Sequence, residues 1–281
     1  MTNLNHKIDF AVIFTVSNAN PNGDPLNGNR PRQNYDGYGE VSDVALKRKV
    51  RNRLQDMGES IFVQSDDRAH DGFKSLKERA DAVSELKQAD KDKNKDLFMD
   101  IASKTWLDVR SFGQVFAFKG DVLSVGVRGP VSIHPAVSIN PIDISSVQIT
   151  KSVNSTTSDK KGSDTMGMKH RVDFGVYVFY GSINTQLAEK TGFSKDDAEK
   201  IKTTLITLFE NDASSARPDG SMEINKVYWW EHNSKMGQYS SAKVHRSLEI
   251  NPKIDEPKSI EDFDIKLKGL EGLEPSVYEG Q

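Results

Sequence analysis

A run of amides, prolines and cations follows the first apolar stretch of this 281-residue chain. The sequence NANPNGDPLNGNRPR, from Asn18 to Arg32, contains almost no apolar side chain and cannot bury itself in a core. Amide, guanidinium and backbone N–H groups are the donors that proteins direct at phosphate oxygens. We therefore predict that this stretch contacts a phosphate backbone. The residues expected to make these contacts are Asn18, Asn20, Asn22, Gly23, Arg30 and Arg32.

A predicted helix from Ser42 to about Met57 carries a second set of cations. At about 100° per residue, Lys47, Arg48 and Arg51 fall on one edge beside the apolar stripe of this helix. Ser42 is a suitable N-cap, and helix starts also bind phosphate. An ordinary solvated helix face would show the same cations. The helix follows the Asn-rich stretch directly, and this position favours the interpretation that its cations bind phosphate.

A third set of cations belongs to a long polar segment between two strand patterns. From Lys151 to Arg171 the chain has five Lys and Arg against two acids, and the segment ends in Lys169-His170-Arg171. A polar connection of this length inside a compact domain is either functional or disordered. We predict that Lys151, Lys169, His170 and Arg171 contact phosphate as well.

The overall charge conceals this basic character. The net charge is −3, but residues 251–281 hold eight acids against four Lys, which leaves +1 on the first 250 residues. We expect the acidic tail to be loosely held, because it has excess acid and few aromatic residues.

Several other classes of function lack support in the sequence. There is no cysteine, which excludes disulfides and thiolate metal sites. The acidic run DKDKNKD (residues 90–96) lacks the Gly and Glu that a calcium loop requires, and no zinc, serine-hydrolase or P-loop motif is present. We expect no metal, no cofactor and no membrane segment, and we expect a cytoplasmic protein.

Alternation of apolar residues predicts the strands that position these cations. Residues 8–16 form a period-2 pattern that we interpret as a strand packed on one face only. Further strands are predicted at residues 131–139 and 172–183, and a charged, solvated helical insertion at residues 73–104. Helices at residues 42–57 and from Ser194 onward complete an α+β fold with helices on one sheet face.

These segments, in this order, resemble the Cas-seven family of CRISPR backbone subunits, with the subtype I-C form as the nearest pattern. The resemblance covers about residues 1–250 and is carried mainly by NPNGDP and KHRVDFGVY. It implies a modified RRM or ferredoxin-like palm with a helical finger insertion and a β-hairpin thumb. The implied bounds are 1–57 and 105–250 for the palm, 58–104 for the finger, 143–170 for the thumb and 251–281 for an acidic C-terminal tail.

The resemblance also implies a function. Several copies would coat the spacer part of a CRISPR RNA and present it to the complementary target DNA strand, in a Cascade complex with a large subunit and a Cas-five-type subunit. The stretch from Asn18 to Arg32 and the following helix would hold the guide, and Met166 and Met168 would pack on a displaced base. His134 belongs to the same predicted RNA-binding set. The sheet lacks an RRM aromatic motif, so base stacking on the sheet is not implied.

Two alternatives remain open from the sequence. One is an endoribonuclease of the same superfamily (RAMP) that processes CRISPR RNA with His134 or His170 as general acid or base. Such chemistry needs two groups that converge on one phosphate, and the sequence contains no paired motif. The other is a structural oligomer that binds no nucleic acid, which would leave the basic stretches unexplained.

Overall fold

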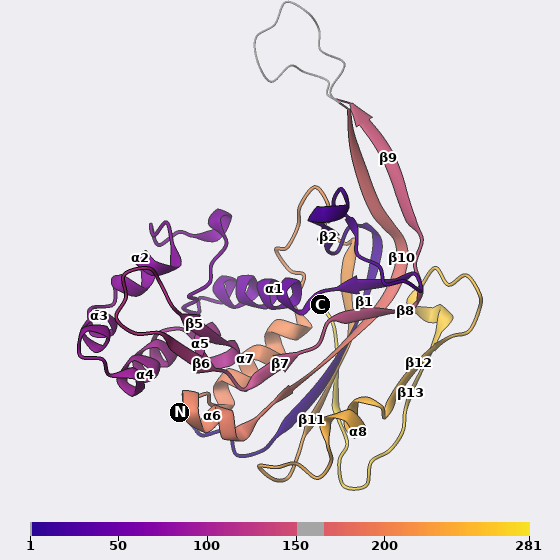
Figure 1. Cartoon of the computed structure of the whole chain (residues 1–281). Helices are drawn as coiled ribbons and strands as arrows, with labels where there is room; N and C mark the ends of the chain where they lie inside the picture. The colour runs from indigo at the N-terminus through magenta and orange to yellow at the C-terminus, as the bar shows by residue number, and fades with distance from the viewer. Residues whose placement is uncertain (1, 151–165) are drawn as a thin grey trace, which may run out of the picture.

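The computed structural model describes residues 2–150 and 166–281. Its centre is an antiparallel sheet, shown in Figure 1. The strands lie in the spatial order β14 (Ser276–Glu279), β11 (Met222–Glu231), β1 (Ile8–Ala19), β10 (Met166–Ile183), β8 (Ala136–Pro141) and β4 (Tyr38–Val41). Two further strands, β7 (Val131–Ile133) and β9 (Ile144–Thr150), pair with β10. The long strand β10 therefore pairs with β9 at its first residues and with β7 at its last residues.

The chain builds this sheet in the β-α-β-β-α-β order of ferredoxin-like folds. Helices α1 (Asp43–Asp56) and α7 (Lys195–Ile206) follow β1 and β10 and pack on the same sheet face. Ser42 and Ser194 cap them, each by accepting a backbone N–H bond. The predicted α+β fold with helices on one face of a sheet is confirmed.

Strand β1 is buried on both faces, so the expectation of a strand packed on one side is wrong. Phe10 and Phe14 face the helices, whereas Ala11 and Ile13 contact a separate cluster on the opposite face. That cluster contains residues of α8 (Ser241–His245), β12 (Leu248–Pro252) and β13 (Phe263–Leu267). The small or apolar residues at positions 11 and 13 are compatible with this second covered face.

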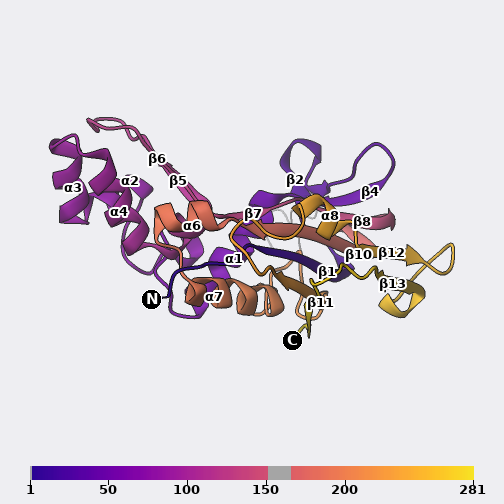
Figure 2. The same cartoon turned by 90° about the horizontal axis from the view of Figure 1, so that it is seen from below.

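A second hydrophobic core lies beside the sheet, at the end of the molecule seen clearly in Figure 2. Phe62, Trp106 and Phe116 pack together, with ring centroids 4.6 Å and 5.0 Å from that of Phe62. The elements around them are α2 (Leu76–Asp81), α3 (Ser84–Lys91), α4 (Lys95–Thr105), α5 (Leu107–Phe112), β5 (Gly113–Phe116) and β6 (Val125–Arg128). These contacts continue past residue 104, the predicted end of the finger, because the β5–β6 pair closes the same core.

The C-terminal segment is not loosely held, contrary to the expectation from its acidity. Strand β14 pairs with β11 of the central sheet, and β13 pairs with β12. Phe263 and Leu273 are buried in the cluster on the far sheet face. A few well-spaced apolar residues therefore fix this segment despite its net charge of −4.

Candidate nucleic-acid interface

The loop that follows β1 is held in a defined shape by its own polar side chains. Asn20 donates to the backbone oxygen of Asn29 at 2.7 Å, and Asp24 caps the short 3-10 helix Pro25–Asn27. Strand β2 (Gly23–Asp24) pairs with β3 (Arg30–Pro31). The amides predicted to contact phosphate thus also shape the loop.

Two further features fix this loop relative to α1. Asn22 accepts a hydrogen bond from the backbone N–H of Ser42 at 3.0 Å, so the loop is tied to the start of the helix. A Cβ atom at position 23 would collide with the side chain of Asn29, which explains the glycine there. Asn18 has a left-handed backbone (φ 53°), a conformation that Asn tolerates.

Arg30 joins this loop to the hairpin formed by β9 and the first part of β10. Its Nη1 donates to Ser146 Oγ at 2.8 Å and lies 3.5 Å from His170 Nδ1. Ser146 and His170 share a hydrogen bond of 2.8 Å between Oγ and Nδ1. Two polar stretches separated by 140 positions in the sequence therefore meet at one place.

The β9–β10 hairpin extends away from the sheet, as Figure 1 shows. Because directly paired residues share a face, Met166, Met168 and His170 lie on one side of the ribbon. Lys169 and Arg171 lie on the other side, together with Val147 and Ile149. The two Met, the two cations and the two β-branched residues are all exposed. Lys151 lies outside the described residues.

The cations of α1 are directed elsewhere. Lys47 pairs with Asp43 one turn earlier at 2.9 Å, and Arg48 donates to the backbone oxygen of Val63 at 2.7 Å. Burial lowers the pKa of Arg48, and the neighbouring charge of Arg51 adds to this effect. The structure thus places Arg48 against the second core and not beside Arg30.

Arg51 is also bonded inside the protein. Its Nε donates to Asp108 at 2.8 Å, and Asp108 is fully buried. The same carboxylate accepts the backbone N–H groups of Phe62 and Val63. Arg51 is therefore an anchor between α1 and the second core.

Arg32, in the Asn-rich loop, is half-buried and lies 3.5 Å from Asp24.

His134 lies far from the meeting point of the loop and the hairpin. It follows β7, whose Ile133 pairs with Gly181 near the far end of β10. At a strand rise of about 3.3 Å per residue, position 181 is about 36 Å from His170. The two His suggested for a ribonuclease therefore do not converge on one phosphate.

Sequence reasoning missed a buried polar cluster around Asp9. Asp9 accepts from His232 Nε2 at 2.8 Å and from Lys7 at 2.9 Å, and His245 Nε2 is 3.8 Å away. Burial would raise the pKa of Asp9, but hydrogen bonds from His232, Ser241 and Lys7 outweigh it and lower the pKa. Burial lowers the pKa of His245 against the opposing charge of Asp9. The only sequence signal was an acid inside an apolar strand.

Where β1 and β10 pair, both faces of the central sheet are covered and are not open for base stacking. Aromatic residues of β1 and β10 such as Phe14 and Tyr177 are fully buried under α1 and α7. The opposite face is covered by α8, β12 and β13. Within residues 2–150 and 166–281, no group of three or more acidic or His side chains is arranged for a metal ion. No helix of the described part of the chain is long and apolar enough to span a membrane.

Comparison with known proteins gives a consistent result. Residues 6–268 match the family model described as CRISPR-associated protein Cas7. A Haloferax volcanii protein described as CRISPR-associated protein Cas7 is 29% identical over 239 residues, covering 76% of this chain and 67% of the relative. A chain of a solved CRISPR RNA-guided surveillance complex, pre-nicking, matches the fold with a TM-score of 0.53 and 17% identity, over 80% of this chain and 78% of that chain. The protein described here belongs to the CRISPR-associated protein Cas7 family.

Proposed function

We propose that this chain is a backbone subunit of a CRISPR RNA-guided surveillance complex and binds the guide RNA. Family membership supports the class of complex. The observation that carries the proposal is the contact of Arg30 with Ser146 and His170, which joins the Asn-rich loop to the base of a projecting hairpin. Amides, cations and backbone N–H groups gathered in one place suit a phosphate backbone.

The two faces of the hairpin suggest different roles in RNA binding. Met166 and Met168 are exposed on the face that also carries His170, and thioethers pack well on flat, polarisable groups such as bases. Lys169 and Arg171 lie on the opposite face, where they can hold phosphates. The hairpin would thus act as the thumb that displaces a base of the guide.

We further propose that the subunit is not a catalyst and that sequence information comes from pairing between guide and target DNA strand. Several copies would line the guide, in a subtype I-C complex with a large subunit and a Cas-five-type subunit. We place this complex in the cytoplasm. The wide separation of His134 and His170 supports a scaffold over a ribonuclease that uses both.

The test uses Lys169→Ala combined with Arg171→Ala, two exposed cations of the hairpin. Binding to guides of unrelated sequence should weaken by a similar factor, and the slope of log K against log salt should flatten by about 1.4, at about 0.7 per lost phosphate contact with a single strand. The matched control is Lys87→Ala with Lys91→Ala, which removes the same charge from α3. An equal loss in the control, or a loss limited to certain guides, would contradict the proposal.

A further inference from the structure

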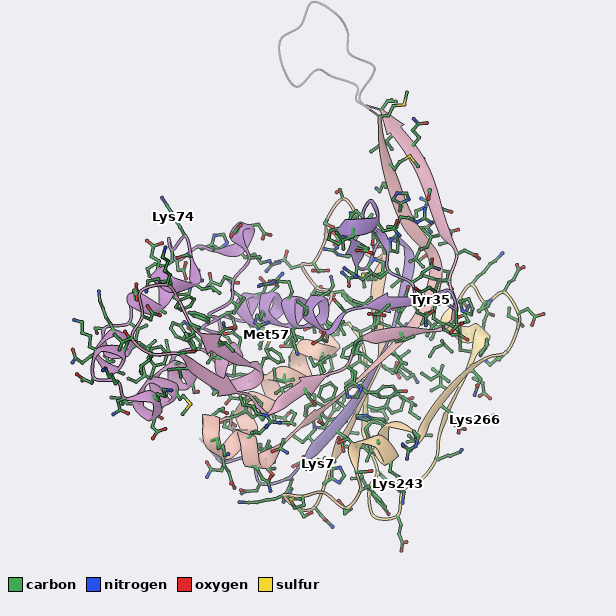
Figure 3. The ribbon with its side chains drawn as sticks, viewed as in Figure 1. Lys7, Tyr35, Met57, Lys74, Lys243 and Lys266 are labelled. Atoms are coloured by element: carbon green, nitrogen blue, oxygen red, sulfur yellow. The ribbon has the colours of Figure 1, made fainter. Side chains whose placement is uncertain are left out.

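A rigid turn before β4 presents an aromatic side chain to solvent. Tyr35 is fully exposed. The side chain of Asn34 accepts hydrogen bonds from the backbone N–H groups of Asp36 and Tyr38, at 3.0 and 2.9 Å. Gln33 donates to the backbone oxygens of Gly37 and Ile142. The turn is thus firmly held, while its one large side chain is left uncovered by the described residues. Figure 3 labels Tyr35 near the base of the hairpin.

A groove of about 480 Å³ lies between α4, β6 and α6 (Thr185–Thr191). Met99, Val127 and Leu187 supply apolar lining. Arg128 and Lys190 also line it, and among the described residues neither has an acidic partner within 4.0 Å. Of the two acids in the lining, Asp100 is paired with Lys104 at 2.6 Å, which leaves Asp96 against two cations.

The turn and the groove cannot meet within one copy. Gln33 bonds to Ile142, which lies against Gly175 of β10, whereas the groove begins beyond Ile183 at the other end of this strand. At about 3.3 Å per residue, these positions on β10 are about 26 Å apart. When a projection on one copy fits a groove at a different place on the next copy, the contact is heterologous. Such a contact repeats from head to tail along a row of copies.

The chemistry of the turn matches this groove. Residues 33–37, which form the turn, contain Asp36 and no Lys or Arg, so the turn would repel phosphate. Its aromatic side chain suits the apolar lining, and the carboxylate of Asp36 suits Arg128 and Lys190. Two other cavities of similar size are less suitable. In the cavity of about 460 Å³ beside α2, the cation Arg79 already pairs with Asp71 at 2.6 Å. The cavity of about 530 Å³ beside β8 is lined by four acids and one Lys, so it would repel Asp36.

We propose that Tyr35 and Asp36 of one copy enter the groove between α4, β6 and α6 of the next copy. Tyr35 rests on Met99 and Leu187, and Asp36 lies beside Arg128 and Lys190. The proposal rests on the proposed function and deepens it by naming the contact between neighbouring copies. Buried aromatic anchors beside complementary charges are typical of the residues that dominate protein interfaces.

The first test places the photoreactive residue p-benzoylphenylalanine at Tyr35 and mixes isotopically light and heavy copies on guide RNA. After irradiation, mass spectrometry should find light–heavy cross-links from position 35 to peptides that contain Met99 or Leu187. The same residue at Leu26, which is 98% exposed on the neighbouring loop, should not give them. Cross-links from position 35 to RNA, or to peptides of the cavity beside α2, would overturn the proposal.

The second test exchanges charges across the contact. Asp36→Lys should weaken association between copies at least about tenfold, because it sets three cations together at the rim of the groove. Lys190→Glu in the same chain should restore association. Binding of one copy to a short RNA should not change in either variant, and its loss in Asp36→Lys would overturn the contact. Failure of the unsubstituted chain to bind this RNA would contradict the proposed function instead. An Asp36→Lys variant that assembles normally would overturn the contact.

Discussion

At the scale of single residues, substitution of Arg51 is expected to change the stability of the fold, because its guanidinium is bonded to Asp108 inside the protein. Arg51→Ala would leave the fully buried Asp108 without its cation. Breaking one side of a buried ion pair costs about 3 kcal/mol or more of unfolding free energy. We predict a loss of about this size in chemical denaturation of the isolated chain.

Lys47→Ala is the matched control on the same helix edge. Lys47 pairs with Asp43 one turn away, and such pairs contribute only about 0.2–0.5 kcal/mol. If Arg51→Ala were as mild as Lys47→Ala, the ion pair with Asp108 would not anchor the second core. The cations of α1 look alike in the sequence, because helical spacing shows which residues share an edge but not where a distant buried acid will lie.

The cluster around Asp9 predicts how stability depends on pH. The folded-state pKa of His245 lies below its ordinary 6.5, so the unfolded chain binds a proton more readily as pH falls through this value. Stability from His245 is therefore complete above pH 6.5 and declines below it. The pKa of Asp9 is also lowered, so its contribution is present above 3.8 and is lost as pH falls further.

Denaturant titrations at several pH values check this prediction. The free energy of unfolding should fall as pH drops below 6.5, and His245→Gln should reduce this slope. Asp9→Asn should reduce the acid dependence below about pH 4, near the ordinary carboxyl pKa. It should also deepen the fall below pH 6.5, because it removes the charge that opposes the lowering of the His245 pKa. If the free energy of unfolding rose as the pH was lowered from 6.5 to 5.5, the assignment of a buried His245 that resists protonation would be contradicted.

At the scale of elements, the sequence was informative where a pattern is local. The strands, the capped helices and the absence of a core in the Asn-rich stretch all follow from periodicity and turn residues. The contact of Arg30 with Ser146 and His170 could not be predicted, because nothing local relates positions 30, 146 and 170. The exposed Tyr35 was missed as well, since a loop Tyr gives no sign of its exposure.

The hairpin should be dispensable for folding and necessary for assembly on RNA. Ser146 and His170 are directly paired, so an Asn-Gly turn can replace residues 147–169 and keep both. The described residues removed are exposed or half-buried, so circular dichroism and the unfolding midpoint should change little. Native mass spectrometry should show that the shortened chain no longer assembles on a full-length guide. Normal assembly would exclude the hairpin as the thumb.

At the scale of the whole molecule, long-range packing determines which segments are ordered and where the cores lie, and composition alone does not show this. Residues 251–281 look solvated by charge, yet β14 completes the edge of the central sheet. The charged insertion conceals a core because the apolar residues of that core come from six short elements and from Phe62 and Trp106 between elements, spread over residues 62–127. Arg110 joins this core to helix α7 through a bidentate bond to Asp197, with two distances of 2.9 Å. Pairings of this kind depend on the tertiary fold.

The central claim is that guide RNA lies against the Asn-rich loop and the base of the hairpin. The most direct measurement is ultraviolet cross-linking of the purified assembly with its bound RNA, followed by mass spectrometry of the nucleotide-bearing peptides. The account predicts that the cross-linked peptides come from residues 18–32 and 166–171. Cross-links confined to the second core at residues 62–127 or to residues 248–281 would contradict it.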